Sequence, residues 1–317
     1  MITKQQWHGV DIYVLENEQL SFSLCPSIGN NGYRLFDKAA QREVLRVPDN
    51  PSVLAASPVH YGTPVLTPPN RIKNGYFKVG EQEYRLERNE KNNTGNHIHG
   101  FSVGRPWKVT GASKGEDKLT ITSEFSTADF PELLEQYPHE ILMEMTYELS
   151  GSALLQKVVV RNDSSKPAPF GFGLHTWFLL DHQPEKWQLQ LPVSASWELG
   201  SDLTPTGNLL PLGDLAELTN GINLQNRNLD DVFQIGEYTP LAVLRRDNYE
   251  IRYVPSAEFK QWVIYTKGVT EDVICLEPYT WVTNAPNLSL DADTTGFRTI
   301  DPGKKLELEV LLEIRHS

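Results

Sequence analysis

Apolar and polar residues alternate in many segments of the chain, and this pattern constrains the fold more than any other feature of the sequence. In residues 141–149 the apolar positions include Ile141, Met143, Met145, Tyr147 and Leu149, and mostly polar residues lie between them. Residues 306–314 repeat the pattern. Because successive side chains of an extended strand point to opposite faces, both segments are predicted to be strands with one buried face.

Shorter runs of this kind occupy residues 118–125, 187–193, 241–246, 249–255 and 262–266. The helical signal is confined to residues 131–137, about two turns, with Asp129 as a candidate cap and Pro131 in the first turn. Many short strands without long helices between them favour an antiparallel sandwich or barrel. Since no low-complexity linker or clear repeat divides the chain, we predict an all-β fold, a large antiparallel β-sandwich with very little helix, in a single domain over residues 1–317.

The charge of the chain narrows the class of its partner. The formal net charge is -12, and Arg and Lys are scattered along the sequence. A protein that binds nucleic acid needs a basic face, and an acidic surface has no attraction to anionic lipid. No uncharged apolar run reaches membrane-spanning length, and no apolar segment typical of a secretory signal follows the first residues. We therefore expect a small neutral molecule or a protein as partner, with no nucleic acid and no membrane.

The two cysteines, Cys25 and Cys275, lie far apart in the sequence, and neither belongs to a CxxC pair. This spacing favours neither a disulfide framework nor a zinc site. A reducing cytoplasm is the simplest compartment for such a chain.

The segment Asn96-His97-Ile98-His99-Gly100-Phe101 contains two histidines two residues apart. On an extended strand they would share a face, which suggests a metal site of the cupin kind. That pattern requires a carboxylate a few residues later, whereas Gly100 to Gly104 contain none. We expect no metal here, and the alternative is a histidine pair that hydrogen-bonds to the backbone.

A second segment, residues 169–180, places Gly171, Gly173 and His175 on one face of an extended strand, with Trp177 beyond them on the same face. Glycine weakens a strand, and close approach by a ligand or another backbone is a common reason for its presence. We interpret the two glycines as a floor cleared for a ligand, on which Trp177 could stack against a sugar ring. The alternative is a bulged core strand with a hydrogen-bonded histidine.

A third segment, residues 272–281, is a buried strand by its apolar run and contains Glu277. A carboxylate in such surroundings is costly unless it is paired or hydrogen-bonded. Pro278 cannot donate to a strand ladder, so we expect the strand to end there. An aromatic pocket formed by Tyr279 and Trp281 would raise the pKa of Glu277 into the range of a general base. The alternative is a structural glutamate bonded to backbone.

These segments follow one another in a recognisable order together with two further ones. The landmarks are Asn70-Arg71-Ile72-Lys73-Asn74-Gly75, Asn96 to Gly100, Gly173-Leu174-His175, Leu276-Glu277-Pro278 and Asn284-Ala285-Pro286-Asn287. In this order the chain resembles the aldose 1-epimerase (galactose mutarotase) family, over most of its length. The resemblance implies the large galactose mutarotase-like supersandwich with an open cleft on one face, and a free sugar as substrate without metal, nucleotide or other cofactor.

The resemblance also implies the catalytic roles. Glu277 would remove the proton of the anomeric hydroxyl, and His175 would protonate the ring oxygen. Ring opening, rotation about the C1 to C2 bond and reclosure would then deliver the other anomer.

By the same resemblance His99 and Arg71, with Asn70 beside it, are expected to bind sugar hydroxyls. An acidic residue is expected between residues 229 and 233, where Asp230 is favoured over Asp231 and a solvated turn is the alternative. His97 leaves open which imidazole contacts the sugar. Phe101 stands where many galactose-specific relatives have a second glycine, so galactose is not assumed as the substrate.

Three other functions remain compatible with these residues. A hexose-6-phosphate 1-epimerase would bind phosphate through Arg71, Lys73 or Arg105. A glycoside hydrolase would use Glu277 and Asp230 as paired carboxylates. A non-catalytic sugar-binding module would keep the cleft without needing the acid-base pair.

Overall fold

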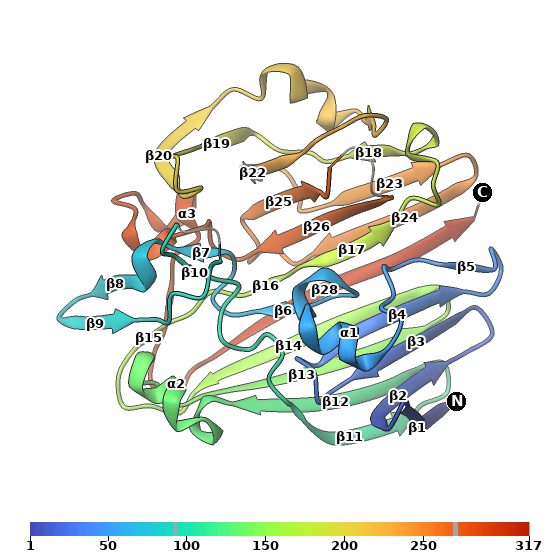
Figure 1. The fold of residues 1–317 in the computed structure, drawn as a ribbon, viewed down its shortest axis with the longest axis horizontal. Helices are drawn as coiled ribbons and strands as arrows, with labels where there is room; N and C mark the ends of the chain where they lie inside the picture. The colour runs from blue at the N-terminus through green and yellow to red at the C-terminus, as the bar shows by residue number, and fades with distance from the viewer. Residues whose placement is uncertain (92–93, 269–271, 317) are drawn as a thin grey trace.

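The computed structural model describes residues 1–91, 94–268 and 272–316, and three antiparallel sheets dominate it (Figure 1). The five-stranded sheet has the order β1 (Ile2–Trp7), β2 (Val10–Glu16), β3 (Leu20–Cys25), β4 (Asn31–Asp37), β5 (Arg42–Glu43). The nine-stranded sheet has the order β11 (Lys108–Lys114), β12 (Leu119–Ser126), β13 (Ile141–Ser150), β14 (Ala153–Asn162), β28 (Lys305–His316), β24 (Tyr249–Pro255), β23 (Ala242–Arg246), β18 (Gln188–Gln190), β21 (Ile222–Asn223). The eight-stranded sheet has the order β20 (Pro205–Leu210), β19 (Ala195–Leu199), β22 (Asp230–Gln234), β25 (Gln261–Thr266), β26 (Val273–Tyr279), β16 (Gly173–Leu174), β6 (Val65–Leu66), and β17 (Thr176–Leu179) also pairs with β26.

The remaining elements are short. Three strand pairs stand apart, namely β7 (Arg71–Ile72) with β10 (His97–Ile98), β8 (Tyr76–Val79) with β9 (Gln82–Arg85), and β15 (Ala168–Pro169) with β27 (Thr299–Ile300). The helices are α1 (Pro51–Ala56), α2 (Pro131–Gln136) and α3 (Ala292–Thr295), with 3-10 turns η1 (Pro58–His60), η2 (Lys73–Gly75), η3 (Thr127–Asp129), η4 (Pro184–Lys186), η5 (Gly213–Thr219) and η6 (Ala285–Asn287). Among the described residues, no helix is long and apolar enough to span a membrane.

The five-stranded and eight-stranded sheets both pack against the nine-stranded sheet. Phe22 of β3 lies 5.0 Å from Tyr147 of β13 between ring centroids, and Trp262 of β25 lies 6.0 Å from Tyr253 of β24. One continuous cluster of buried side chains runs from Leu15 to Ile314. The predicted all-β sandwich is therefore confirmed, and the assignment of residues 1–317 to a single domain stays a prediction.

The predicted strands agree with the observed ones to within a few residues. Residues 249–255 coincide with β24, whereas β18 covers only the middle of the predicted segment 187–193. The predicted helix is α2, but Phe130 occupies its cap position and Asp129 belongs to the preceding turn η3, so the proposed Asp129 cap is wrong. The helix α1, which begins with Pro51, is not among the predicted elements.

Candidate active site

The eight-stranded sheet presents one face to the core and the opposite face to a cleft of about 570 Å³. Along β26, Ile274 and Leu276 point into the main core, while Cys275 and Glu277 point to the cleft side. This alternation follows from the two-residue period of a strand. The polar residues that line the cleft include Asn70, Arg71, Glu90, His99, His175, Asp230, Tyr265 and Glu277.

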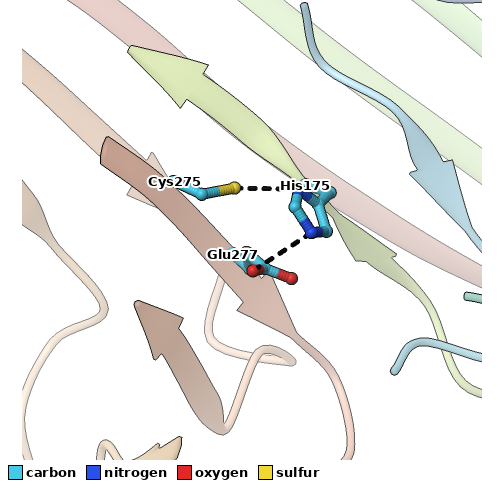
Figure 2. A group of neighbouring side chains, drawn as sticks. All are labelled: His175, Cys275 and Glu277. Atoms are coloured by element: carbon cyan, nitrogen blue, oxygen red, sulfur yellow. Dashed lines mark hydrogen bonds and ion pairs between the residues drawn. The ribbon is translucent and has the colours of Figure 1, made fainter. Parts of the chain in front are cut away.

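His175 lies opposite Glu277 because of the register between neighbouring strands. Gly173 pairs with Tyr279 and Thr176 pairs with Leu276, so the same register brings His175 beside Glu277. Figure 2 shows the two side chains pointing toward each other, and the distance from His175 Nε2 to Glu277 Oε1 is 3.3 Å. The fold therefore brings Glu277 of β26 beside His175, which lies between β16 and β17, although the two residues are about a hundred positions apart in the chain.

Burial disfavours charge on both members of this pair. Burial raises the pKa of Glu277 from 4.5 to about 8, although the Tyr279 hydroxyl, which donates a hydrogen bond to Oε2, lowers it. Burial also lowers the pKa of His175 from its usual 6.5. At neutral pH these shifts favour a protonated Glu277 carboxyl beside a neutral His175 imidazole, so the pair holds one exchangeable proton.

Cys275 occupies the other side of the His175 ring. Its Sγ lies 2.9 Å from Nδ1, while Glu277 faces Nε2 (Figure 2). Donor atoms of the three residues lie within 4.8 Å of one another, as in many metal sites. However, the thiol and the carboxylate approach different ring nitrogens, and a metal ion binds along the lone pair of one nitrogen. The arrangement suits proton exchange between neighbours better than coordination of one ion by all three.

The loop that carries His99 places its imidazole over the pair. The backbone N–H of His99 donates to the Asn70 carbonyl at 2.9 Å, and its ring lies edge-on to His175 with 5.1 Å between centroids. His99 Nδ1 is buried and has no hydrogen-bond partner among the described residues. A substrate hydroxyl could supply that partner.

His97 has a different environment, because the chain leaves the extended conformation at His99, where φ is 64°. His97 Nδ1 lies 2.7 Å from the Glu87 carbonyl, and His97 does not border the cleft. The expectation that the two histidines share a strand face is therefore wrong, and His99 is the one that borders the cleft.

Phe101, two residues after His99, lies outside the cleft lining. Its ring packs 5.3 Å from Tyr137. Gly100 explains why the loop turns here. A Cβ at Gly100 would lie 2.2 Å from the Thr67 carbonyl oxygen, and φ is +76°. Only glycine allows this close approach of two backbones.

Arg71 enters the cleft wall from β7 and is held by an acidic partner. Its Nε donates to Glu90 Oε1 at 2.8 Å, and both side chains are largely buried. Asn70 Oδ1 accepts the backbone N–H of Arg71 at 2.9 Å, and Asn96 Nδ2 donates to Glu90 Oε2 at 3.1 Å. This network fixes the guanidinium while leaving part of it facing the cleft.

Asp230 lies at the mouth of the cleft, in the first position of β22. It pairs with Tyr265, which in turn pairs with Cys275, so these side chains form a row across three strands. Asp231 is not among the lining residues and points to the other face of β22. Asp230 remains exposed, yet the surrounding protein raises its pKa by desolvation.

Trp177 borders the cleft, but its side chain is fully buried below the floor. Its Nε1 donates to the Val59 carbonyl at 2.7 Å, and its ring packs 5.3 Å from His175. No ring face is open for a sugar, so Trp177 supports the histidine from beneath.

The two glycines near His175 do not clear a floor for a ligand. A Cβ at Gly171 would lie 2.1 Å from Trp281, and one at Gly173 would lie 2.3 Å from Tyr279. Aromatic side chains of the protein therefore occupy both spaces. The expectation that the strand ends at Pro278 is also wrong, since β26 runs to Tyr279 and Pro278 pairs with Trp262.

Sequence reasoning missed three contributors to the site. Tyr279 was expected only as an apolar wall, whereas its hydroxyl binds Glu277. Cys275 alternates with Leu276 and so shares the face of Glu277, a signal that the pattern contained. Glu90 lies in a polar segment without periodicity, and nothing in that segment points to Arg71.

Comparison with known proteins identifies the family. The model of the aldose 1-epimerase family matches residues 15–313, so the chain belongs to this family. The human galactose mutarotase is 29% identical over 184 residues, 54% of this chain and 48% of the relative. The uncharacterised protein YihR of Escherichia coli K12 is 27% identical over 164 residues, 51% of this chain and 50% of the relative. The matched regions thus span about half the length of these curated relatives.

Solved structures extend the similarity to the whole fold. A galactose mutarotase-like protein from Clostridium acetobutylicum has a TM-score of 0.95 and 26% identity, and the match covers 100% of this chain and 99% of that one. A putative aldose 1-epimerase from Escherichia coli K12 has a TM-score of 0.78 and 18% identity, over 96% of this chain and 99% of that one. The second comparison supports the fold alone.

Proposed function

We propose that this protein interconverts the α and β anomers of a free aldose by acid-base opening and closure of the sugar ring. The observation that carries the proposal is the pairing of Glu277 with His175, 3.3 Å apart beside the cleft. The anomeric hydroxyl oxygen and the ring oxygen of an aldose are bonded to the same carbon. A base and an acid that serve these two oxygens must therefore lie close together, as this pair does.

In the ring-opening step, the proton held by Glu277 first moves to His175 Nε2 across the 3.3 Å contact. The Glu277 carboxylate then takes the proton of the anomeric hydroxyl while His175 gives its Nε2 proton to the ring oxygen. The electron pair of the broken O–H bond forms the carbonyl bond, and the pair of the broken C1–O5 bond stays on the new hydroxyl. After rotation about the C1 to C2 bond, the two residues exchange roles and close the ring. Each positioned proton transfer contributes about 10² to 10⁴-fold to the rate.

The other lining residues supply hydrogen-bonding groups for a sugar. Arg71 offers N–H donors, the free Nδ1 of His99 can donate or accept, and Asn70 and Asp230 offer acceptors on the same cleft. We assign substrate binding to these four residues. The proposed chemistry needs no metal or other cofactor, because both proton transfers are performed by side chains.

The charges around the cleft favour a neutral sugar over a sugar phosphate. Arg71 is already paired with Glu90. Lys73 pairs with Asp202 at 2.7 Å, Arg105 pairs with Glu132 at 3.0 Å, and neither borders the cleft. Lys91 also borders the cleft and is exposed, so the Lys and Arg side chains of the described lining are this lysine and the paired Arg71. A phosphate dianion would need several cationic donors close to the substrate, more than these two side chains supply.

Exchange NMR on the α and β anomer signals of a panel of hexoses, pentoses and their 6-phosphates tests the proposal. We expect faster exchange of at least one unphosphorylated aldose. Acceleration confined to the phosphates would favour the hexose-6-phosphate epimerase, and release of nitrophenol from nitrophenyl glycosides would favour a hydrolase. Sugar binding without any acceleration would favour a binding module. A cytoplasmic location stays a prediction.

A further inference from the structure

The contact between Cys275 and His175 is not used by the proposed mechanism. The Sγ to Nδ1 distance is 2.9 Å, and both side chains are buried. Because a buried ring nitrogen requires a hydrogen-bond partner, the sulfur determines whether Nδ1 donates or accepts a hydrogen bond. Figure 2 shows that the thiol and the carboxylate both come from β26 and contact the imidazole on different sides.

We propose that Cys275 is a positioning residue for the acid, whose sulfur accepts the Nδ1–H of His175 and so leaves Nε2 as the nitrogen that gives and takes the catalytic proton. This inference rests on the proposed function. It names a residue with no direct contact to the reacting atoms, acting through the imidazole.

The reversibility of the reaction requires this tautomer. During opening, the imidazolium loses its Nε2 proton to the ring oxygen, and during closure neutral His175 must take a proton at Nε2 from the same oxygen. Neutral His175 must therefore carry its remaining proton on Nδ1. A neutral ring protonated at Nε2 could accept a proton only at Nδ1, which faces Cys275 and not the cleft.

The thiol has one proton, and its surroundings direct that proton elsewhere. A carboxyl oxygen of Glu277 lies within 4.8 Å of the Cys275 sulfur, and in this proposal the S–H points to that carboxyl. The sulfur lone pairs then remain for the Nδ1–H of His175. Burial and the neighbouring carboxylate raise the pKa of Cys275, so the thiol keeps its proton and does not replace either member of the pair.

The backbone holds these atoms in place. The His175 N–H donates to the Pro64 carbonyl at 3.0 Å, and Cys275 pairs with Trp177 across β26 and β17. Because the main chain is fixed at both residues, the short Cys275 side chain keeps its sulfur in direct contact with Nδ1 of His175. Loss of the sulfur would leave Nδ1 buried without an acceptor, which favours the Nε2–H tautomer that free histidine prefers in water.

The test is ¹⁵N NMR of protein labelled at the histidine ring nitrogens, near pH 7, with mutarotation measured on the same samples. The His175 signals are identified by their loss in His175→Ala. In the wild type we expect a protonated Nδ1 and an unprotonated Nε2. In Cys275→Ala we expect a shift to the Nε2–H tautomer and a rate about tenfold lower, the order expected for one buried hydrogen bond.

Cys275→Ser should restore both readouts, since a hydroxyl also accepts and donates. Cys25→Ala is the matched control, because Cys25 is likewise buried but lies in a separate cluster. An Nε2–H tautomer in the wild type, or an unchanged tautomer in Cys275→Ala, would overturn the proposal. If Cys275→Ala does not fold, the tautomers of the wild type and of Cys275→Ser test the proposal, and both must have the proton on Nδ1. The expected tautomers with no acceleration of any aldose would support Cys275 and reject the proposed function.

Discussion

The ring of Tyr279 lies directly over Gly173, so closely that a Cβ on Gly173 would come within 2.3 Å of Cδ1. Gly173 and Tyr279 are paired across β16 and β26. From this position the Tyr279 hydroxyl donates to Glu277, two residues earlier on the same face. The absence of a side chain at Gly173 therefore helps to orient the proposed catalytic base.

Gly173→Ala should displace Tyr279 and reduce both stability and activity. We expect the free energy of unfolding to fall by about 1–3 kcal/mol, the usual cost of overpacking a core, and kcat to fall further than the folded fraction explains. Denaturant unfolding and exchange NMR measure the two effects.

Two glycine variants serve as controls for this prediction. Gly171→Ala would clash with Trp281 at 2.1 Å and should lose stability while the folded fraction keeps its kcat. Gly111→Ala meets only Thr122 at 3.8 Å and should change neither. Equal losses of kcat in Gly171→Ala and Gly173→Ala would argue against a specific role of Tyr279.

Tyr279→Phe should move the alkaline limit of activity to higher pH. The wild-type pair needs one proton, so its activity should decline above the pKa of about 8 that Glu277 has in the folded protein. The Tyr279 hydroxyl lowers that pKa, and its removal raises it. We also expect kcat at neutral pH to fall about tenfold, because a buried carboxylate loses a donor. Profiles of kcat against pH for both proteins check this, and superimposable alkaline limbs would contradict it.

Glu277→Gln and His175→Ala should each lower kcat by at least about 10²-fold, since each removes one positioned proton transfer. His182→Ala is the control, because its side chain is 93% exposed and lies outside the cleft. Exchange NMR on the best aldose gives the rates. Near wild-type exchange in Glu277→Gln would remove Glu277 from the proposed mechanism.

The sequence predicts those parts of the fold and site that follow from local periodicity. Alternation suffices to place β24 and to assign Glu277 and Leu276 to opposite faces, because the period of a strand does not depend on its neighbours. The pairing of His175 with Glu277 needed the family resemblance, since it depends on a register set between distant strands.

Other features depend on tertiary contacts that no local pattern contains. A glycine in a strand indicates open space but not its occupant, and Tyr279 and Trp281 occupy it here. The direction in which the His99 side chain points depends on the positive φ of that residue, which an alternating pattern does not predict. The Glu90 partner of Arg71 comes from a segment without periodicity, so only the folded structure reveals it.

The pH dependence of stability should report the buried Glu277. Its pKa rises from 4.5 to about 8 on folding, so between these values the folded state holds more protons than the unfolded chain and the free energy of unfolding falls with rising pH. His175 contributes the opposite slope, because burial lowers its pKa, but that contribution ends above its unfolded value of 6.5. From pH 6.5 to 8 the wild type should therefore lose stability relative to Glu277→Gln, by up to about 1.4 kcal/mol per pH unit. Denaturant unfolding across this window measures the difference, and Glu81→Gln, at a fully exposed side chain, should follow the wild type. Parallel curves for the wild type and Glu277→Gln would mean that Glu277 is already ionised at pH 6.5.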